Sequence, residues 1–283
     1  MKKTIAVIAA LVAGALVFAG GSKDSVAASK SALSGTYTFG GSTTVQPIAN
    51  AAIEQFVKAN PNVKISYEGL GSSTGLKQLL AKTVTLAGSS RDLKSSELDG
   101  GAVPVVVARD SIAVVVNKDI AVANLTTDQL TAIYAGTVKN WKEVGGPNEA
   151  IVVVNRDETS GTYGTFKELV LDPKKLEFTK NAIVSKENGE VAAKVATTPG
   201  AIGYVGLGFV SEIAKAGGKA LSLNGVMPTV ATTLDSTYPL SRNLYMATLG
   251  AAVEGSVEKA FIDYVLSPRG AVIVKEAGFV PVK

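Results

Sequence analysis

The chain of 283 residues contains no cysteine and no histidine. Without these side chains it cannot form the usual zinc sites, carry out thiol chemistry or assemble a Ser-His-Asp catalytic triad. Catalysis by a Ser-Lys pair or by two carboxylates remains open. The composition therefore disfavours most enzyme classes, and we predict no catalytic centre, no metal site and no cofactor.

Clusters of positive charge are also missing. Lys and Arg number 28 against 24 Asp and Glu, the formal net charge is +4, and the lysines are scattered along the chain. A nucleic-acid surface needs basic residues that are gathered and interleaved with aromatic ones, so we expect no nucleic-acid partner. With 46% hydrophobic and 18% charged residues, the chain has a globular composition. Its length suits one large domain or two of ordinary size.

The N-terminal segment has the layout of a secretory signal peptide. Lys2 and Lys3 precede an apolar run from Ile5 to Ala19 that is short for a membrane span, and small residues follow. We predict that residues 1–20 are a signal peptide. The protein would then be exported, to the periplasm or to the outer face of the cytoplasmic membrane. An uncleaved N-terminal anchor helix is the alternative.

The end of this segment, LVFAGGS, resembles the lipobox of bacterial lipoproteins, in which a cysteine receives the lipid. Gly21 stands in that place, so this chain cannot be lipidated there. Either the cysteine has been replaced or this is a released homologue. If residues 1–20 are removed, we expect membrane contact only through a lipid anchor in the natural form. Residues 21–34 are small, polar and without periodicity, which predicts a flexible tether.

Beyond the tether, strand-like and helix-like segments alternate. Residues 35–41 and 62–71 have strand patterns, whereas 42–61 and 72–84 carry apolar residues at helical spacing. Residues 103–119 are almost continuously β-branched, which is typical of a strand covered on both faces, of two strands, or of one strand that crosses between lobes. The alternation continues to two C-terminal helices and an end strand. This pattern predicts an α/β fold with largely parallel sheets.

Four of the strand-to-helix junctions share one design, in which small hydroxyl residues follow the end of a strand. They comprise Ser42, Thr43 and Thr44; Ser72, Ser73 and Thr74; Ser89, Ser90 and Arg91; and Arg156 followed by Ser160, Gly161 and Thr162. A helix N-terminus has free N–H groups and partial positive charge, and arginine matches a tetrahedral oxyanion. Each junction alone is an ordinary helix cap. Because the carboxyl ends of parallel strands meet at one edge of a sheet, four together predict an anion-binding pocket.

Three motifs invite other interpretations. Residues 69–75, GLGSSTG, resemble a dinucleotide fingerprint, but the last gap is one residue too long. Asp157 and Glu158 have the residue types of a catalytic carboxylate pair, although we expect one of them to hold Arg156 by a salt bridge. Trp141 has a ring that can stack on a ligand, and we expect it to be a packing residue.

Several motifs together resemble one family. They are GGSTTVQPIA, GLGSSTGLKQLL, AGSSRDL, IYAGTVKNWKEVGG, NRDETSGTYGTF and TTPGAIGYVG. From about Gly35 to its end, the chain resembles the phosphate-binding, extracytoplasmic substrate-binding proteins of phosphate-specific ABC transporters, a periplasmic binding protein type 2-like family. The resemblance implies a two-lobed type II fold, in which each lobe is a mixed sheet flanked by helices. One phosphate would bind in the interlobe cleft, which closes by a hinge.

The resemblance also implies boundaries and ligand contacts. We expect lobe 1 to comprise residues 35–110 and 235–283, and lobe 2 to comprise residues 111–234. The expected phosphate contacts are Ser42, Thr43, Thr44, Ser72, Ser73, Ser90, Arg91, Arg156, Ser160, Gly161 and Thr162. Arg156 would be the cationic clamp. The family's well-studied members place an aspartate where Ser90 aligns, so this chain lacks that acceptor for the proton of phosphate.

The expected function is high-affinity binding of inorganic phosphate and its delivery to the permease subunits of an ABC importer, without chemistry and as a monomer. One alternative is a signalling or surface-adhesion protein of the same fold that responds to phosphate. Another is a receptor for a different tetrahedral oxyanion. A third is an exported phosphatase or esterase that uses Ser160, which the lack of histidine makes unfavourable.

Overall fold

The computed structural model describes residues 33–282. The predicted signal peptide (1–20), Gly21 and nearly all of the predicted tether (21–34) lie outside these residues. Strands and helices alternate through the part of the chain that is described, which confirms the predicted α/β class. Within that part, every helix is too short or too polar to span a bilayer.

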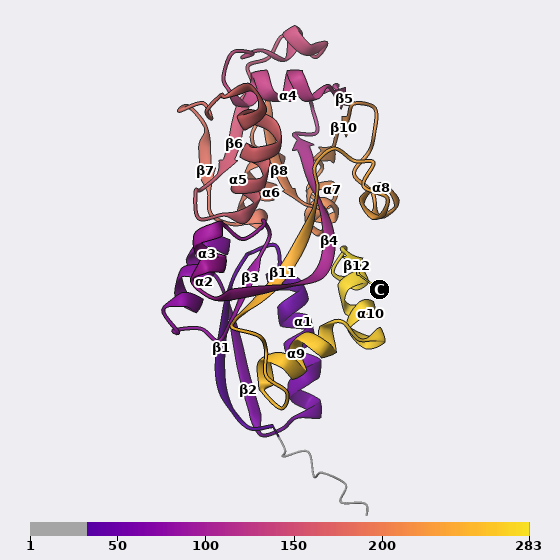
Figure 1. The fold of residues 1–283 in the computed structure, drawn as a ribbon. Coiled ribbons are helices and arrows are strands. Elements are labelled where there is room, and N and C mark those ends of the chain that lie inside the picture. Colours follow the sequence, from indigo (N-terminus) through magenta and orange to yellow (C-terminus); the bar gives the residue numbers. More distant parts are fainter. Residues whose placement is uncertain (1–32, 283) are drawn as a thin grey trace, which may run out of the picture. The chain divides into compact units, whose positions relative to one another are not determined.

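Lobe 1 contains three neighbouring parallel strands and the helices that follow them. Its elements are β1 (Gly35–Gly41), α1 (Gln46–Ala59), β2 (Val63–Gly69), α2 (Ser72–Leu80), β3 (Leu86–Ser89), α3 (Ser95–Asp99), β11 (Ser241–Leu249), α9 (Val257–Val265), α10 (Pro268–Glu276) and β12 (Val280–Pro281). Helices α1, α9 and α10 contact one another, and α2 packs with α3 and β3. Figure 1 shows the first group at one side of the lobe 1 strands and the second at the other.

Lobe 2 has the same kind of alternation. Its elements are β5 (Asn124–Leu125), α4 (Thr127–Tyr134), β6 (Val152–Arg156), α5 (Gly161–Phe166), β7 (Ile183–Ser185), α6 (Asn188–Thr197), β8 (Ala201–Gly206), α7 (Val210–Lys215), β9 (Lys219–Ala220), β10 (Ser222–Leu223) and α8 (Val230–Leu234). The helix predicted after Ser160 changes character, because α5 continues as a π-helical segment, Lys167–Leu171. A 3-10 turn, Trp141–Val144, lies between α4 and β6.

Most strands form one mixed sheet. Its order is β2-β1-β3-β11-β4-β8-β6-β7, and β9 and β12 also pair with β4. The pairs of β1 with β2 and β3 are parallel, as are those of β6 with β7 and β8, whereas every pairing of β4 or β11 is antiparallel. The prediction of largely parallel strands therefore holds inside each lobe and fails at the strands between them.

The long strand β4 (Ala102–Val116) passes from one lobe to the other. Its first part, to Ser111, pairs with β11, and its last part, Ile112–Val116, pairs with β8. Figure 1 shows β4 running beside β11 between the two groups of strands. The last part is buried on both faces, since Val114 packs into one hydrophobic cluster and Val115 into another. This explains the continuous β-branched run and confirms that one strand crosses between the lobes.

Each lobe has an aromatic centre. In lobe 1 the ring of Phe261 packs against Phe39 and Phe56, and in lobe 2 the rings of Phe166 and Tyr204 stack 4.0 Å apart. Trp141 is fully buried and its indole N–H donates to the carbonyl of Gly200 at 2.9 Å, which confirms it as a packing residue.

The expected lobe boundaries remain a prediction. Tyr238 and Leu240, which we assigned to lobe 1 by sequence, pack into the hydrophobic cluster of lobe 2. The return of the chain to lobe 1 therefore fits better at β11 than at residue 235.

A buried ion pair joins the two crossing strands. Asp110 on β4 lies opposite Arg242 on β11, and one Asp110 carboxylate oxygen accepts from Arg242 Nε and Nη2 at 2.8 and 2.6 Å. The other oxygen accepts from the Leu207 amide at 2.9 Å. The side chains are 0% and 4% exposed. Burial raises the pKa of Asp110, and the Arg242 charge together with the Leu207 amide opposes that rise.

We predict that Asp110→Ala destabilises the fold strongly. The substitution leaves the Arg242 guanidinium buried without its counter-charge, which costs about 3–5 kcal/mol. The double variant Asp110→Ala/Arg242→Met removes both charges and is expected to recover most of that loss. Urea unfolding of the three proteins measures both effects, and additive losses in the double variant would contradict the coupling.

Candidate anion-binding site

The structure brings the four predicted junctions together. The Ser90 amide donates to Ser72 Oγ at 3.1 Å, and the Thr44 and Thr162 hydroxyl oxygens lie 3.2 Å apart. A Cβ atom at Gly161 would lie 2.2 Å from Ser72 Oγ and 2.7 Å from Ser90 Oγ. We call the side chains of Thr43, Thr44, Ser72, Ser90, Ser160 and Thr162 the hydroxyl cluster; none is more than 5% exposed.

Local backbone geometry explains why the lobe 1 junctions meet. β1 pairs in parallel with β3, so both strands end at the same edge of the sheet. Gly41 at the end of β1 has a φ of +123°, and a Cβ there would lie 2.4 Å from the Gly88 carbonyl oxygen. Only glycine allows this approach. Beyond it, the Ser42 amide donates to that same carbonyl at 2.8 Å and starts the turn into α1.

Arg156, the last residue of β6, places a buried cation in the cluster. Its side chain is 2% exposed. Nη2 donates to Thr43 Oγ1 at 3.0 Å and to the Lys186 carbonyl at 2.6 Å, whereas Nε and Nη1 have no partner among residues 33–282. Burial lowers the pKa of Arg156 to about 10, so the guanidinium is still charged at neutral pH. A buried charge with two unmet donors is unfavourable unless an anion binds it.

The salt bridge that we expected to hold Arg156 is wrong. The Asp157 carboxylate accepts from the Thr159 amide and hydroxyl in a local turn. Within the described residues, neither Asp157 nor Glu158 forms an ion pair with Arg156; a threonine hydroxyl and a backbone carbonyl hold it instead. Neutral partners leave the full positive charge available to a ligand.

The start of α5 adds further donors. Ser160 caps the helix, because its hydroxyl oxygen accepts from the Tyr163 amide at 3.3 Å. The amides of Gly161 and Thr162 belong to the first helical turn and have no acceptor inside the helix. Gly161 lies beside Ser72 and Ser90, and the Thr162 hydroxyl lies beside Thr44. Donors from two lobes therefore meet around the same point.

Three of the expected ligand residues are engaged elsewhere. The Arg91 guanidinium forms an ion pair with Glu97 at 2.7 Å and donates to Ser73 Oγ at 3.2 Å. Ser42 Oγ accepts from the amides of Thr44 and Val45 in the turn that precedes α1. We therefore leave Arg91, Ser73 and the Ser42 hydroxyl out of the set proposed below, since each supports the cluster through other residues.

Two residues at the site were missed by the sequence analysis. Arg242 Nη1 donates to Thr162 Oγ1 at 3.0 Å and to the Ser90 carbonyl at 2.9 Å. Asn188, fully buried, donates to the hydroxyls of Thr43 and Thr44. Asn188 begins α6 shortly after β7, which ends at Ser185, so it stands at a further strand-to-helix junction that carries an amide in place of a hydroxyl. Arg242 could have been identified from the sequence, because it is a charged residue inside a segment with a strand pattern.

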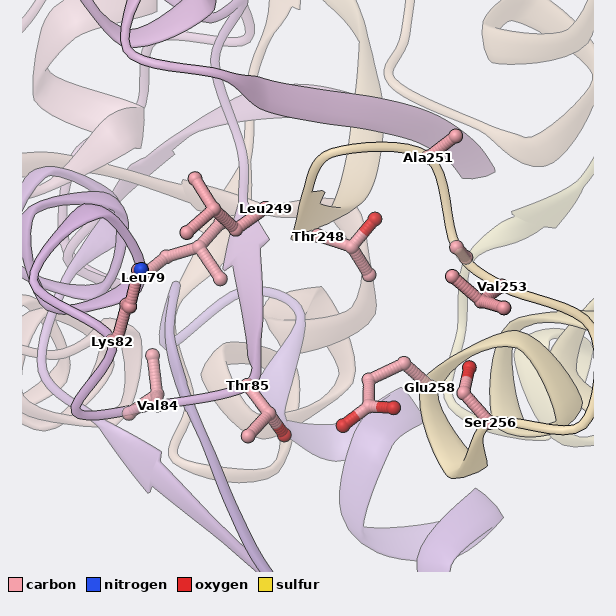
Figure 2. A pocket seen from close by; sticks show the side chains of 11 residues that line it. Leu79, Lys82, Val84, Thr85, Thr248, Leu249, Ala251, Val253, Ser256 and Glu258 are labelled. Carbon is pink, nitrogen blue, oxygen red and sulfur yellow. The ribbon is translucent and has the colours of Figure 1, made fainter.

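A cavity in lobe 1, away from the hydroxyl cluster, is less suited to an anion. Figure 2 shows a cavity of about 250 Å³ in lobe 1, where Leu79, Val84, Leu249 and Val253 lie among a few polar side chains. Apart from a rim lysine, its lining lacks the buried cationic donors that an anion needs. Across residues 33–282, no three Asp or Glu side chains gather as a metal site would require.

A cavity of about 270 Å³ adjoins the hydroxyl cluster. Thr43 and Asn188 line it and also belong to the contacts of the cluster, and Gln46, Asn50 and Glu212 contribute polar groups to its wall. Thr43 and Asn188 therefore border both this cavity and the hydroxyl cluster.

Known proteins are similar to this chain in sequence and in fold. The model of the PBP superfamily domain matches residues 26–269. The phosphate-binding protein PstS of Borreliella burgdorferi is 39% identical over 251 residues, which cover 87% of this chain and 90% of that protein. PstS of Bacillus subtilis is 34% identical over 254 residues, which cover 88% of this chain and 81% of that protein.

Solved structures agree with the sequence relatives. A phosphate ABC transporter substrate-binding protein from Clostridium perfringens, with bound phosphate, superposes with a TM-score of 0.81 at 33% identity; the match covers 88% of this chain and all of that one. The receptor for ABC-type phosphate transport from Vibrio cholerae has a TM-score of 0.72 at 29% identity, over 86% and 99% of the two chains. The two-lobed periplasmic-binding-protein fold is thereby confirmed. The chain belongs to the PBP superfamily and, within it, to the family of PstS phosphate-binding proteins.

Proposed function

We propose that the protein binds inorganic phosphate in the hydroxyl cluster, without chemical change, and delivers it to an ABC importer. The observation that carries the proposal is the buried Arg156 guanidinium with two unmet donors, surrounded by hydroxyl groups from both lobes. Phosphate is the ligand that the relatives' names give, and a tetrahedral oxyanion has the charge and the acceptors that these donors require.

The proposed contacts come from each lobe in similar number. Lobe 1 contributes Thr43, Thr44, Ser72 and Ser90, and lobe 2 contributes Arg156, Ser160, Gly161 and Thr162. A hydrogen bond to a charged group is worth about 1.5–3 kcal/mol. About six to eight such bonds, less the cost of binding, leave roughly −8 to −12 kcal/mol, which corresponds to micromolar to nanomolar affinity.

Because the site lies between the two lobes, binding of the anion can favour closure of the lobes. β4 and β11 connect the lobes, and an anion that bridges donors on both sides favours the conformation in which those donors meet. The approach is close, because Gly161 leaves no space for a Cβ atom against Ser72 and Ser90. We infer that release needs the lobes to separate about the crossing strands, as in hinge closure.

The setting of this function is inferred from the N-terminal pattern and the family. Lys2 and Lys3 followed by an apolar run indicate export, so capture would take place outside the cytoplasmic membrane. The ABC transporter's permease subunits would be the partner, and the protein would act as a monomer. Sulfate is the oxyanion against which selectivity is best measured, because it matches phosphate in shape and lacks its proton.

We predict that Arg156→Ala abolishes phosphate binding. Wild-type protein should bind phosphate with a dissociation constant of about 1 µM or below in isothermal titration calorimetry, and the variant should lose at least about 1,000-fold in affinity. Arg269→Ala, at an exposed position on α10, serves as the matched control and should bind like wild type. A wild-type protein that releases no heat with phosphate, or an unaffected Arg156→Ala variant, would overturn the proposal.

We predict that Gly161→Ala weakens phosphate binding by about 100-fold, because the new methyl group opposes the approach of Ser72 and Ser90 in the closed form. Gly189→Ala is the matched control, since a Cβ at this helical position meets open space. Calorimetry gives the affinities and thermal unfolding checks that both variants fold. Equal affinities of the two variants would show that the lobes do not close against Gly161.

A further inference from the structure

We propose that Asn188 is a positioning residue that makes the Thr43 hydroxyl, and with it the Thr44 hydroxyl, a hydrogen-bond donor toward the anion. This inference rests on the proposed function, because it concerns how the same site holds phosphate. Asn188 begins α6 in lobe 2, whereas both threonines lie between β1 and α1 in lobe 1.

The carboxamide of Asn188 is held in one orientation. Its oxygen accepts from the Gly206 amide at 3.1 Å, which directs the NH₂ group to the other side. There Nδ2 donates to Thr43 Oγ1 at 3.2 Å and to Thr44 Oγ1 at 3.0 Å. The residue is fully buried, so water does not compete for these bonds. Both N–H groups and the oxygen therefore have partners, so toward the two threonines the amide acts only as a donor.

The hydroxyl of Thr43 is consequently limited to donating. A hydroxyl oxygen has two acceptor positions and one proton. Arg156 Nη2, at 3.0 Å, and Asn188 Nδ2 occupy the two acceptor positions, so the proton is left to be donated. An oxyanion beside the unmet Nε and Nη1 of Arg156 is the acceptor that this proton needs.

Thr44 is constrained in the same way. Its oxygen accepts from Asn188 Nδ2 and lies 3.5 Å from Arg242 Nη2. Its proton is left for the anion or for Thr162 Oγ1 at 3.2 Å, which itself accepts from Arg242. Without Asn188, each hydroxyl regains a free acceptor position and can turn its proton away from the ligand. Asn188 therefore acts on phosphate through the threonines and not by contact.

A double-mutant cycle tests this role. Asn188→Ala is expected to weaken phosphate binding by about 10- to 100-fold in calorimetry, the loss of one or two oriented donors. In the Thr43→Val/Thr44→Val background, the same substitution should change affinity by less than about twofold, because the hydroxyls that it orients are gone. Equal losses in the two backgrounds would overturn the inference, since a packing or purely structural role of Asn188 does not depend on the hydroxyls.

Asn117→Ala provides the matched control. Asn117 is another buried asparagine that donates twice, to the carbonyls of Val195 and Ala196 at the opposite end of α6. Its loss should lower the unfolding temperature and leave phosphate affinity within about twofold of wild type. An affinity loss in Asn117→Ala as large as in Asn188→Ala would assign the effect to α6 stability and overturn the inference.

The variant Asn188→Asp tests the role of the amide donors without removing the side chain. The aspartate has the same shape and still accepts from the Gly206 amide, but its second oxygen accepts where the amide donated, so it draws the threonine protons toward itself. We expect it to bind phosphate no better than Asn188→Ala, and wild-type affinity would overturn the inference. If wild-type protein itself fails to bind phosphate, the proposed function fails; if only the Asn188 variants bind normally, this inference alone fails.

Discussion

The buried ion pair of Asp110 and Arg242 connects the strands between the two lobes with the candidate site. It lies where β4 and β11 cross between the lobes, and a charge so far from water requires its partner nearby. Because Arg242 also donates to the Ser90 carbonyl and to Thr162 Oγ1, the pair fixes one element of each lobe relative to the crossing strands. Hinge and ligand site thus share one set of hydrogen bonds.

Arg156 adds a second buried cation, and the two arginines differ in how their charge is met. Asp110 neutralises Arg242, which makes that residue structural. Arg156 is held by a neutral hydroxyl and a backbone carbonyl, and within residues 33–282 its Nε and Nη1 have no hydrogen-bond partner. The desolvation that lowers the pKa of Arg156 also strengthens its attraction for an anion. Preorganised donors of this kind limit the entropy lost on binding.

The hydroxyl junctions were predictable because their signal is local. Ser72 and Ser160 each stand directly before or at a helix start, and Arg156 ends an apolar run, so a short window of sequence contains the pattern. The predicted salt bridge of Arg156 was wrong because a neighbour in sequence was taken for a neighbour in space: Asp157 folds back onto its own turn. The Arg91 guanidinium, which we expected at the ligand, pairs with Glu97 six residues away.

By itself, the sequence determined the α/β class, the family and most of the residues that gather at the candidate site. These follow from periodicity, capping chemistry and motifs, all of which act over a few residues. Only the tertiary structure decided that Asn188 contacts Thr43, 145 positions away, and that Arg242 pairs with Asp110, 132 positions away. Such partners are chosen by which strands become adjacent in the sheet, and by the need of buried donors for acceptors within hydrogen-bonding distance.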